Sequence, residues 1–139
     1  MKTATYRSRF VILACLLICA SVATVASYAT SARMRRQEQA AKSAVERLGQ
    51  VEALFHASGG KYAVSLEELV DFANQAPDQT AAGLLGGSLA TGRLGGYHFT
   101  VKGTPEGYLI TAIPNSIGSS GSIKFYSDET QMIRESRSR

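Results

Sequence analysis

The chain has 139 residues, a formal net charge of +4 at pH 7 and a pI near 9.3. This length excludes a second globular unit, because an N-terminal apolar stretch leaves only about a hundred residues for one core. The positive charge flanks that stretch: residues 1–9 carry +3 and residues 33–54 carry +2, whereas residues 55–139 hold seven basic and eight acidic residues. We expect no nucleic-acid partner, because such binding requires a basic face on the folded part.

Residues 10–32 contain no charged side chain and lie between Arg9 and Arg33. As a helix this run spans about 34 Å, enough to cross a hydrocarbon core of about 30 Å. We therefore predict a transmembrane helix over residues 10–32, preceded by a cytoplasmic n-region over residues 1–9. The alternative is a cleaved secretory signal, because the Ser-Tyr-Ala of residues 27–29 resembles a cleavage site before Thr30. The basic residues on the two sides are too evenly balanced to decide orientation.

Small side chains recur every four residues within the predicted membrane helix. A ridge of this kind lets two helices approach closely in lipid, where packing drives their association. We predict a helix-packing face for self-association, although small residues are also common in any moderately apolar helix. The face consists of Cys15, Cys19, Ala23, Ser27 and Ser31. Because both cysteines of the chain lie here, no disulfide can close the domain that follows.

An amphipathic pattern begins after Arg36. Apolar residues at helical spacing form one stripe, and polar residues at steps of four form another. Because no proline or glycine occurs between residues 10 and 48, we predict one continuous helix that ends near Ser58, with residues 33–58 as its amphipathic part and Gly59-Gly60 as its cap. The apolar stripe is Ala44, Leu48, Val51 and Phe55, and the polar one is Glu38, Lys42, Glu46 and Gln50.

The remaining chain predicts a small α+β domain over residues 59–134 and a basic, frayed tail over residues 135–139. A capping box at Ser65-Leu66-Glu67-Glu68 opens a short helix. Residues 73–96, rich in glycine, alanine and threonine, predict a loop with one helical turn near residues 84–89. A period of two then indicates strands, which the intervening turns join into an antiparallel meander laid on the apolar stripe. The strands are 97–102, 108–113, 123–126 and 132–134.

This arrangement resembles the type IV pilins and pseudopilins, and it is most similar to bacterial pilin-like proteins related to the major pseudopilin of type II secretion, over residues 10–134. The resemblance implies an α+β fold in which the first half of a long N-terminal helix is membrane-inserted and the second half packs on a small antiparallel β-meander. It also implies a single-pass protein of the bacterial inner membrane, with its domain in the periplasm or exterior. The matching segments are Gly59-Gly60-Lys61-Tyr62, residues 65–69, Gly96-Tyr97-His98-Phe99, residues 108–114, residues 125–129 and Ile133-Arg134.

The sequence departs from the family at the processing motif. The family has a glycine before the first phenylalanine and a glutamate after a short apolar run, and prepilin peptidase cleaves after that glycine. Here Arg9 precedes Phe10, and Ala14 stands where the glutamate would fall. The expected function is therefore a structural or accessory subunit of a type IV pilus or type II secretion-like system, with other pilin-like subunits as partners. The alternative is a tethered or secreted extracytoplasmic binding module that uses residues 73–96.

No residue pattern predicts catalysis. His56 and His98 lack metal-ligand spacing, and the glycine-rich residues 83–88 lack the ending of a phosphate loop. We therefore expect no enzyme, cofactor, metal or small-molecule substrate. A calcium site at Asp78, Asp128 and Glu129 is the alternative, because some pseudopilins bind calcium in their C-terminal loop.

Overall fold

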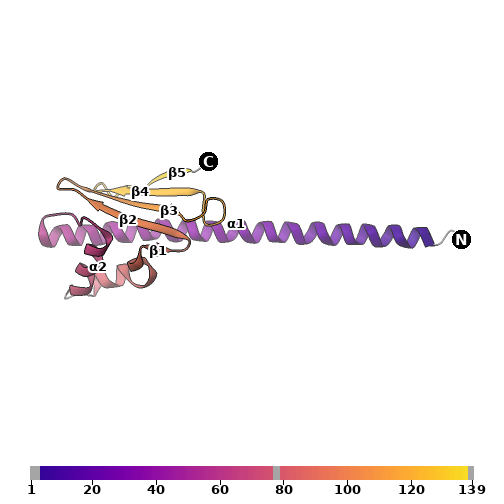
Figure 1. Ribbon diagram of the computed structural model, residues 1–139, viewed down its shortest axis with the longest axis horizontal. Coiled ribbons are helices and arrows are strands. Elements are labelled where there is room, and N and C mark those ends of the chain that lie inside the picture. The colour runs from indigo at the N-terminus through magenta and orange to yellow at the C-terminus, as the bar shows by residue number, and fades with distance from the viewer. Residues whose placement is uncertain (1–3, 77–78, 138–139) are drawn as a thin grey trace. The chain divides into compact units, whose positions relative to one another are not determined.

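The computed structural model describes residues 4–76 and 79–137, and over residues 4–27 it describes the backbone alone. The chain divides into two compact units, Met1–Arg33 and Met34–Arg139. Helix α1 (Ala4–Gly59) begins in the first unit and ends in the second (Figure 1). Among the residues searched, no helix combines the length and apolar character needed to cross a membrane. Most of the predicted transmembrane segment, residues 10–27, lies outside the residues whose side chains are described.

Helix α1 ends where the glycine pair predicts. Gly60 has a φ of 66°, and its N–H donates to the carbonyl of His56 at 2.7 Å. A side chain at that φ would be strained, so glycine allows the chain to leave the helix without cost.

Helix α2 (Leu66–Gln75) confirms the predicted capping box, with one change. The Ser65 hydroxyl accepts the N–H of Glu68 at 3.3 Å. The Glu68 carboxylate accepts the N–H of Val64 at 2.8 Å, one residue before the N-cap. The Ser65 bond therefore satisfies a backbone donor that the first helical turn leaves open, and the Glu68 bond holds the residue before the N-cap.

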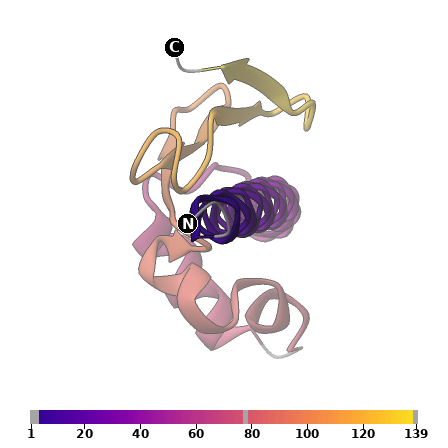
Figure 2. The ribbon, with the colours of Figure 1, turned by 90° about the vertical axis from the view of Figure 1, so that its right-hand side faces the viewer.

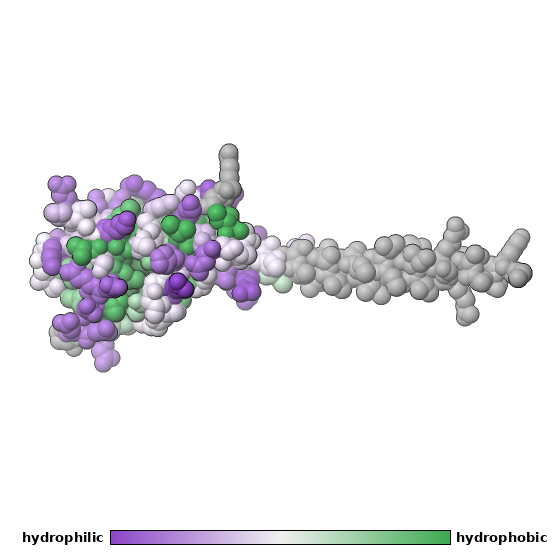
Figure 3. Space-filling model, in the orientation of Figure 1, coloured by the Kyte–Doolittle hydropathy of each residue, from purple (hydrophilic) through white to green (hydrophobic). Residues whose placement is uncertain are grey.

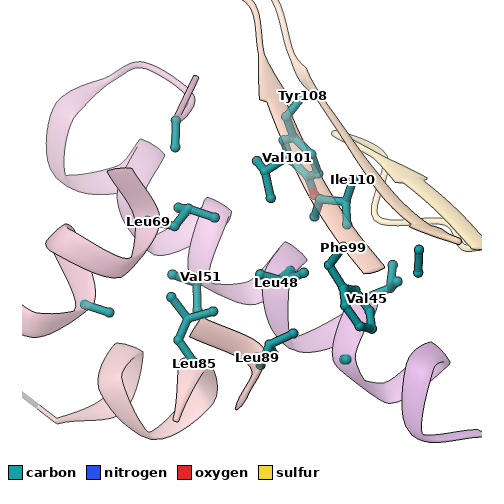
Figure 4. Packing of buried hydrophobic residues seen from close by; sticks show 14 of the residues in the cluster. Val45, Leu48, Val51, Leu69, Leu85, Leu89, Phe99, Val101, Tyr108 and Ile110 are labelled. Carbon is teal, nitrogen blue, oxygen red and sulfur yellow. The ribbon is translucent and has the colours of Figure 1, made fainter. Parts of the chain in front are cut away.

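The prediction of a loop over residues 73–96 is wrong except for the helical turn expected near residues 84–89, where the structure does have helix. This segment holds the end of α2, helix α3 (Thr80–Leu85), the 3-10 helix η1 (Gly87–Thr91) and strand β1 (Arg93–Leu94). Ala81, Leu85 and Leu89 fall at steps of four and are buried. Leu85 and Leu89 lie around Val51 and Leu48 of α1 (Figure 4). Core packing therefore overrides the weak helix propensity of the glycines here.

The predicted antiparallel meander is confirmed: the described residues form a five-stranded sheet in the order β1 to β5. Its longer strands are β2 (Tyr97–Gly103), β3 (Tyr108–Pro114), β4 (Ile123–Asp128) and β5 (Arg134–Arg137). The last strand begins later than the predicted 132–134: β5 includes residues 135–137, which were expected to be frayed, and it pairs with β4 from Tyr126↔Arg134 to Ile123↔Arg137. All four β5 side chains are exposed, so no hydrophobic alternation marks this strand in the sequence.

A single hydrophobic core joins the second part of α1 to the sheet and to the short helices. Figures 1 and 2 agree that strands β2 to β5 lie on one side of α1 and that α2 to η1 lie on another. A long N-terminal helix packed on a five-strand antiparallel sheet is a pilin-like α+β architecture. The core includes Ala41, Ala44, Val45, Leu48 and Val51 of α1, Leu69 of α2, and Tyr97, Phe99, Ile110, Ala112 and Phe125 of the sheet.

Candidate functional site

The predicted helix-packing face stays a prediction. Cys15, Cys19, Ala23 and Ser27 lie outside the residues whose side chains the structure describes. Ser31 is described, and its side chain is exposed on α1.

The structure places the two histidines on different elements of the domain. His56 is exposed in the last turn of α1, and its ring stacks on Tyr62 with a centroid distance of 4.4 Å. His98 is exposed on β2, where its register partners are Arg93 and Ile113. Neither position supplies the clustered ligands that a metal site requires.

Two of the three acids that were considered as calcium ligands, Asp128 and Glu129, have other contacts in the structure. Asp128 accepts hydrogen bonds from the hydroxyl and N–H of Thr130 and pairs with Arg134 at 2.9 Å. The bonds from Thr130 hold the pKa of the Asp128 carboxyl below its usual range, and Arg134 adds to this shift. Glu129 packs against Gly107, and Asp78 lies outside the described residues. Within residues 4–76 and 79–137, no group of three or more acids, histidines or cysteines could hold a metal ion.

Glu52 carries a buried carboxyl group that was not predicted from the sequence. Glu52 is fully buried on α1, and its Oε2 accepts the N–H of Ala63 at 3.2 Å. Burial raises the pKa of this carboxyl to about 7, against the effect of the Ala63 bond. In the described part of the chain, Glu52 Oε1 and the Tyr108 hydroxyl are buried without a hydrogen-bond partner. Glu52 lies four residues after Leu48, and this spacing on the apolar stripe was the signal that could have revealed it.

The face of the sheet that points away from the core is a candidate for binding. Strands β2 and β3 alternate buried and exposed positions, so His98, Thr100 and Lys102 share one face with Leu109, Thr111 and Ile113. Register pairing continues this face across the sheet through Lys102↔Leu109↔Asp128 and Thr111↔Tyr126↔Arg134. Two large apolar side chains are exposed at opposite ends of β3 on this face, Leu109 at 43% and Ile113 at 41% exposure. We define the outer sheet face as Arg93, His98, Thr100, Lys102, Leu109, Thr111, Ile113, Lys124, Tyr126, Asp128 and Arg134.

The outer sheet face is basic, although the domain as a whole is nearly neutral. It carries Arg93, Lys102, Lys124 and Arg134 against the single acid Asp128. Arg134 is already paired with Asp128, and Glu106 and Glu129 line the same hollow as Lys102 beside this face. Figure 3 shows how hydrophobic and hydrophilic residues are interspersed on one side of the domain.

A groove also opens between the start of α2 and strand β2. Its volume is about 440 Å³, within the range of small-ligand sites. Its lining joins the start of α2 to the end of η1 and to β2, through Ser65, Leu66, Glu67, Ala90, Thr91, Gly92, His98, Phe99, Thr100 and Val101.

Neither a protein-family model nor a curated protein sequence matches this chain. The structure therefore supports the fold alone, a pilin-like α+β architecture.

Proposed function

We propose that this chain is a membrane-anchored, pilin-like structural or accessory subunit of a type IV pilus or type II secretion-like system. One observation carries the proposal: the second half of α1 supplies the core of a small antiparallel α+β domain, and an uncharged run precedes it on the same helix.

The described side chains of α1 are exposed near residue 30 and enter the core farther along the helix. Among the α1 side chains that the structure describes, those from residue 28 on, the first fully buried one is Ala41, and from there the apolar stripe enters the core. Side chains over residues 28–33 are exposed. The uncharged residues 10–32 are long enough, as a helix, to cross the hydrocarbon core of a membrane, where a helix satisfies its backbone hydrogen bonds internally.

This proposal places the chain in the bacterial inner membrane as a single-pass protein, with its domain in the periplasm or exterior. Other pilin-like subunits are the expected partners. Because Arg9 and Ala14 replace the residues of the processing motif, an accessory role without prepilin cleavage is included.

The N-terminal residue of the mature chain tests this proposal. Intact-mass measurement and N-terminal sequencing of the membrane fraction should find a start at Met1, for a simple anchor, or at Phe10, for pilin-type processing. A start near Thr30 would overturn the proposal, because the anchor would have been removed. In parallel, Leu17→Arg should move the chain out of the membrane fraction, since a central arginine costs about 2.5–3.5 kcal/mol on insertion. Leu17→Ala at the same position is the control and should stay in the membrane.

The groove between α2 and β2 favours a second candidate, a tethered or secreted binding module. Residues 90–92 line part of this groove. They belong to residues 73–96, the segment expected to contact a ligand in such a module. A start near Thr30, together with a domain found in the aqueous extracytoplasmic fraction, would support this candidate instead.

A further inference from the structure

We propose that one end of the second unit, the entry end, binds the surface of an anionic phospholipid bilayer through three arginines and one exposed isoleucine. These side chains are Arg35, Arg36, Ile117 and Arg137. The inference rests on the proposed function, which places a membrane next to this end, and it names the class of lipid that the domain recognises. The entry end is where the chain enters the domain, and it consists of residues 34–40 of α1, the Gly95-Gly96 turn, the loop over residues 115–122 and the Ile123↔Arg137 pair.

Segments that are far apart in the sequence meet at the entry end. The Glu38 carboxylate of α1 accepts the N–H and the hydroxyl of Ser122, at 2.8 and 3.0 Å. The Asn115 N–H donates to the Gly96 carbonyl at 2.8 Å. A Cβ at Gly96 would lie 3.5 Å from the Gln37 Nε2 of α1. The start of the domain, the turn before β2 and the loop before β4 therefore form one continuous surface.

The arginines reach this surface from two elements. Arg35 and Arg36 are exposed on α1, and Arg137 is exposed on β5. Opposite residues of an antiparallel pair share a face, so Arg137 lies on the same side of the sheet as Ile123. Ile123 and Arg35 line one hollow between α1 and the sheet. Within residues 4–76 and 79–137, none of the three arginines forms an ion pair.

The entry end keeps a positive charge when the neighbouring acids are counted. Glu38 is the one acid among its described residues, against three arginines. One register pair farther into the sheet, Lys124 adds another cation. Lys42 and Glu135 line the same hollow, but they pair with each other at 3.1 Å. Arg33 directly precedes this end in the sequence. This surplus favours an anionic partner.

Ile117 supplies an apolar point of contact beside the arginines. Its side chain is 57% exposed, and the surrounding residues 115–122 carry no charge. The loop is closed by its own hydrogen bonds: the Gly118 N–H donates to the Gly121 carbonyl at 3.0 Å, and the Ser120 N–H to the Ser116 carbonyl at 2.9 Å. An exposed apolar side chain next to basic ones is the combination that binds at the boundary between headgroups and acyl chains.

The position in the chain favours lipid over other anionic partners. The uncharged run ends at residue 32, and Arg35 follows three residues later, about 5 Å along a helix. The headgroup region extends about 5–7 Å beyond each side of the hydrocarbon core. With that run in a membrane, Arg35 and Arg36 reach the level of the phosphates, which arginine binds with paired N–H groups. The domain then recognises the membrane surface as well as being tethered to it.

The depth of a spin label in the full-length chain tests this contact. In a background with Cys15→Ser and Cys19→Ser, Ser119→Cys carries a nitroxide beside Ile117, and Met132→Cys carries one at the other end of the sheet. The chain is placed in nanodiscs of phosphatidylcholine with or without phosphatidylglycerol. Collisions with a water-soluble nickel chelate measure exposure to water. The label at position 119 should be shielded in the phosphatidylglycerol discs alone, and the label at position 132 should be open in both.

Substitutions at the entry end should open the label at position 119 to water. Arg35→Gln/Arg36→Gln/Arg137→Gln should weaken the attachment about a hundredfold, because each basic residue near an anionic surface strengthens it about fivefold. Ile117→Ser alone should open the label in part, since it removes only the apolar contact. High salt should act like the arginine substitutions, because it screens exposed charges.

A matched control removes the same charge from the other end of the domain. Lys61→Gln/Lys102→Gln/Arg134→Gln should leave the label at position 119 shielded in the phosphatidylglycerol discs. The ion pairs that this control breaks, Lys61 with Glu68 and Arg134 with Asp128, are exposed on the basic side, so their loss should cost little stability. Circular dichroism of every variant checks folding.

Three results would overturn the proposal. The label at position 119 could be equally open in both kinds of disc, the arginine variant could stay shielded, or the control could open the label as much. Inorganic phosphate that abolishes the shielding, where chloride of equal ionic strength leaves it intact, would also overturn it, because the arginines would then bind free phosphate. A chain that does not enter the discs would refute the proposed anchor alone. Co-sedimentation of that chain with vesicles of the same two compositions would then test the lipid contact.

Discussion

Glu52 brings an ionisable carboxyl into the interior of the domain, where an unpaired charge is costly. Oε2 bonds to the Ala63 N–H, and the nearby Tyr108 hydroxyl packs over Gly49, one turn earlier on α1. The raised pKa of about 7 means that the folded domain prefers the neutral carboxyl near neutrality. A single buried acid therefore couples the stability of the domain to pH.

Stability should fall as the pH rises from about 4.5 to about 7. Below this window Glu52 is protonated in both states, within it the unfolded chain ionises first, and above it the full penalty remains. The loss should approach about 3 kcal/mol. Denaturant unfolding of the full-length chain at about pH 5 and about pH 8 measures the loss.

Glu52→Gln is the matched control for this pH dependence, because it keeps the shape and removes the charge. The variant should be more stable than wild type at pH 8, and its stability should vary little across the window. The lowered pKa values of Glu68 and Asp128 affect stability below the window. Equal pH dependence in wild type and variant would show that Glu52 does not carry the effect.

At the scale of elements, capping decides where α2 begins. Ser65→Ala removes the acceptor of the Glu68 N–H and should destabilise the domain by about 1 kcal/mol. Ser119→Ala, an exposed change in the loop before β4, should have little effect. Thermal unfolding compares the two, and hydrogen exchange should show the larger change in the first turn of α2. An equal effect of both changes would contradict the role of the cap.

The loop before β4 shows how contacts between elements restrain a segment that looks flexible in sequence. Residues 115–121 are mostly serine and glycine. In the fold, the Glu38 carboxylate on α1 accepts both the N–H and the hydroxyl of Ser122, at 2.8 and 3.0 Å. Lys42, one turn later, pairs with Glu135 of β5 at 3.1 Å rather than serving as a purely solvated charge. Two of the four residues of the predicted polar stripe, Glu38 and Lys42, therefore link α1 to the start of β4 and to β5.

At the scale of the whole domain, α1 connects the sheet with the short helices. Leu48→Ala should destabilise the domain by about 2–5 kcal/mol, because Leu48 is fully buried in the shared core. Leu54→Ala on the same helix should cost far less, since Leu54 is 38% exposed. Chemical unfolding followed by far-ultraviolet circular dichroism and by tyrosine fluorescence should give coincident transitions for wild type. Separate transitions for helix and tyrosine signals would contradict one shared core.

Two glycine sites show which backbone features can be predicted from local sequence and which cannot. The Gly59-Gly60 cap follows from local backbone preference alone. Gly103 is different: a Cβ there would meet the carbonyl of Ala63, which lies forty residues earlier in the chain. No local rule distinguishes Gly103 from any other glycine at a strand end, because its neighbour is set by the tertiary fold.

The sequence by itself determined the long helix, its glycine stop, the capped second helix and the antiparallel meander, because these depend on periodicity and local backbone preference. The tertiary structure alone decided the burial of Glu52, the helices within residues 73–96, the pairing of β5 and the collection of basic side chains on one sheet face. Those features depend on register and on contacts between distant segments, which determine which side chains lose water and which face outward.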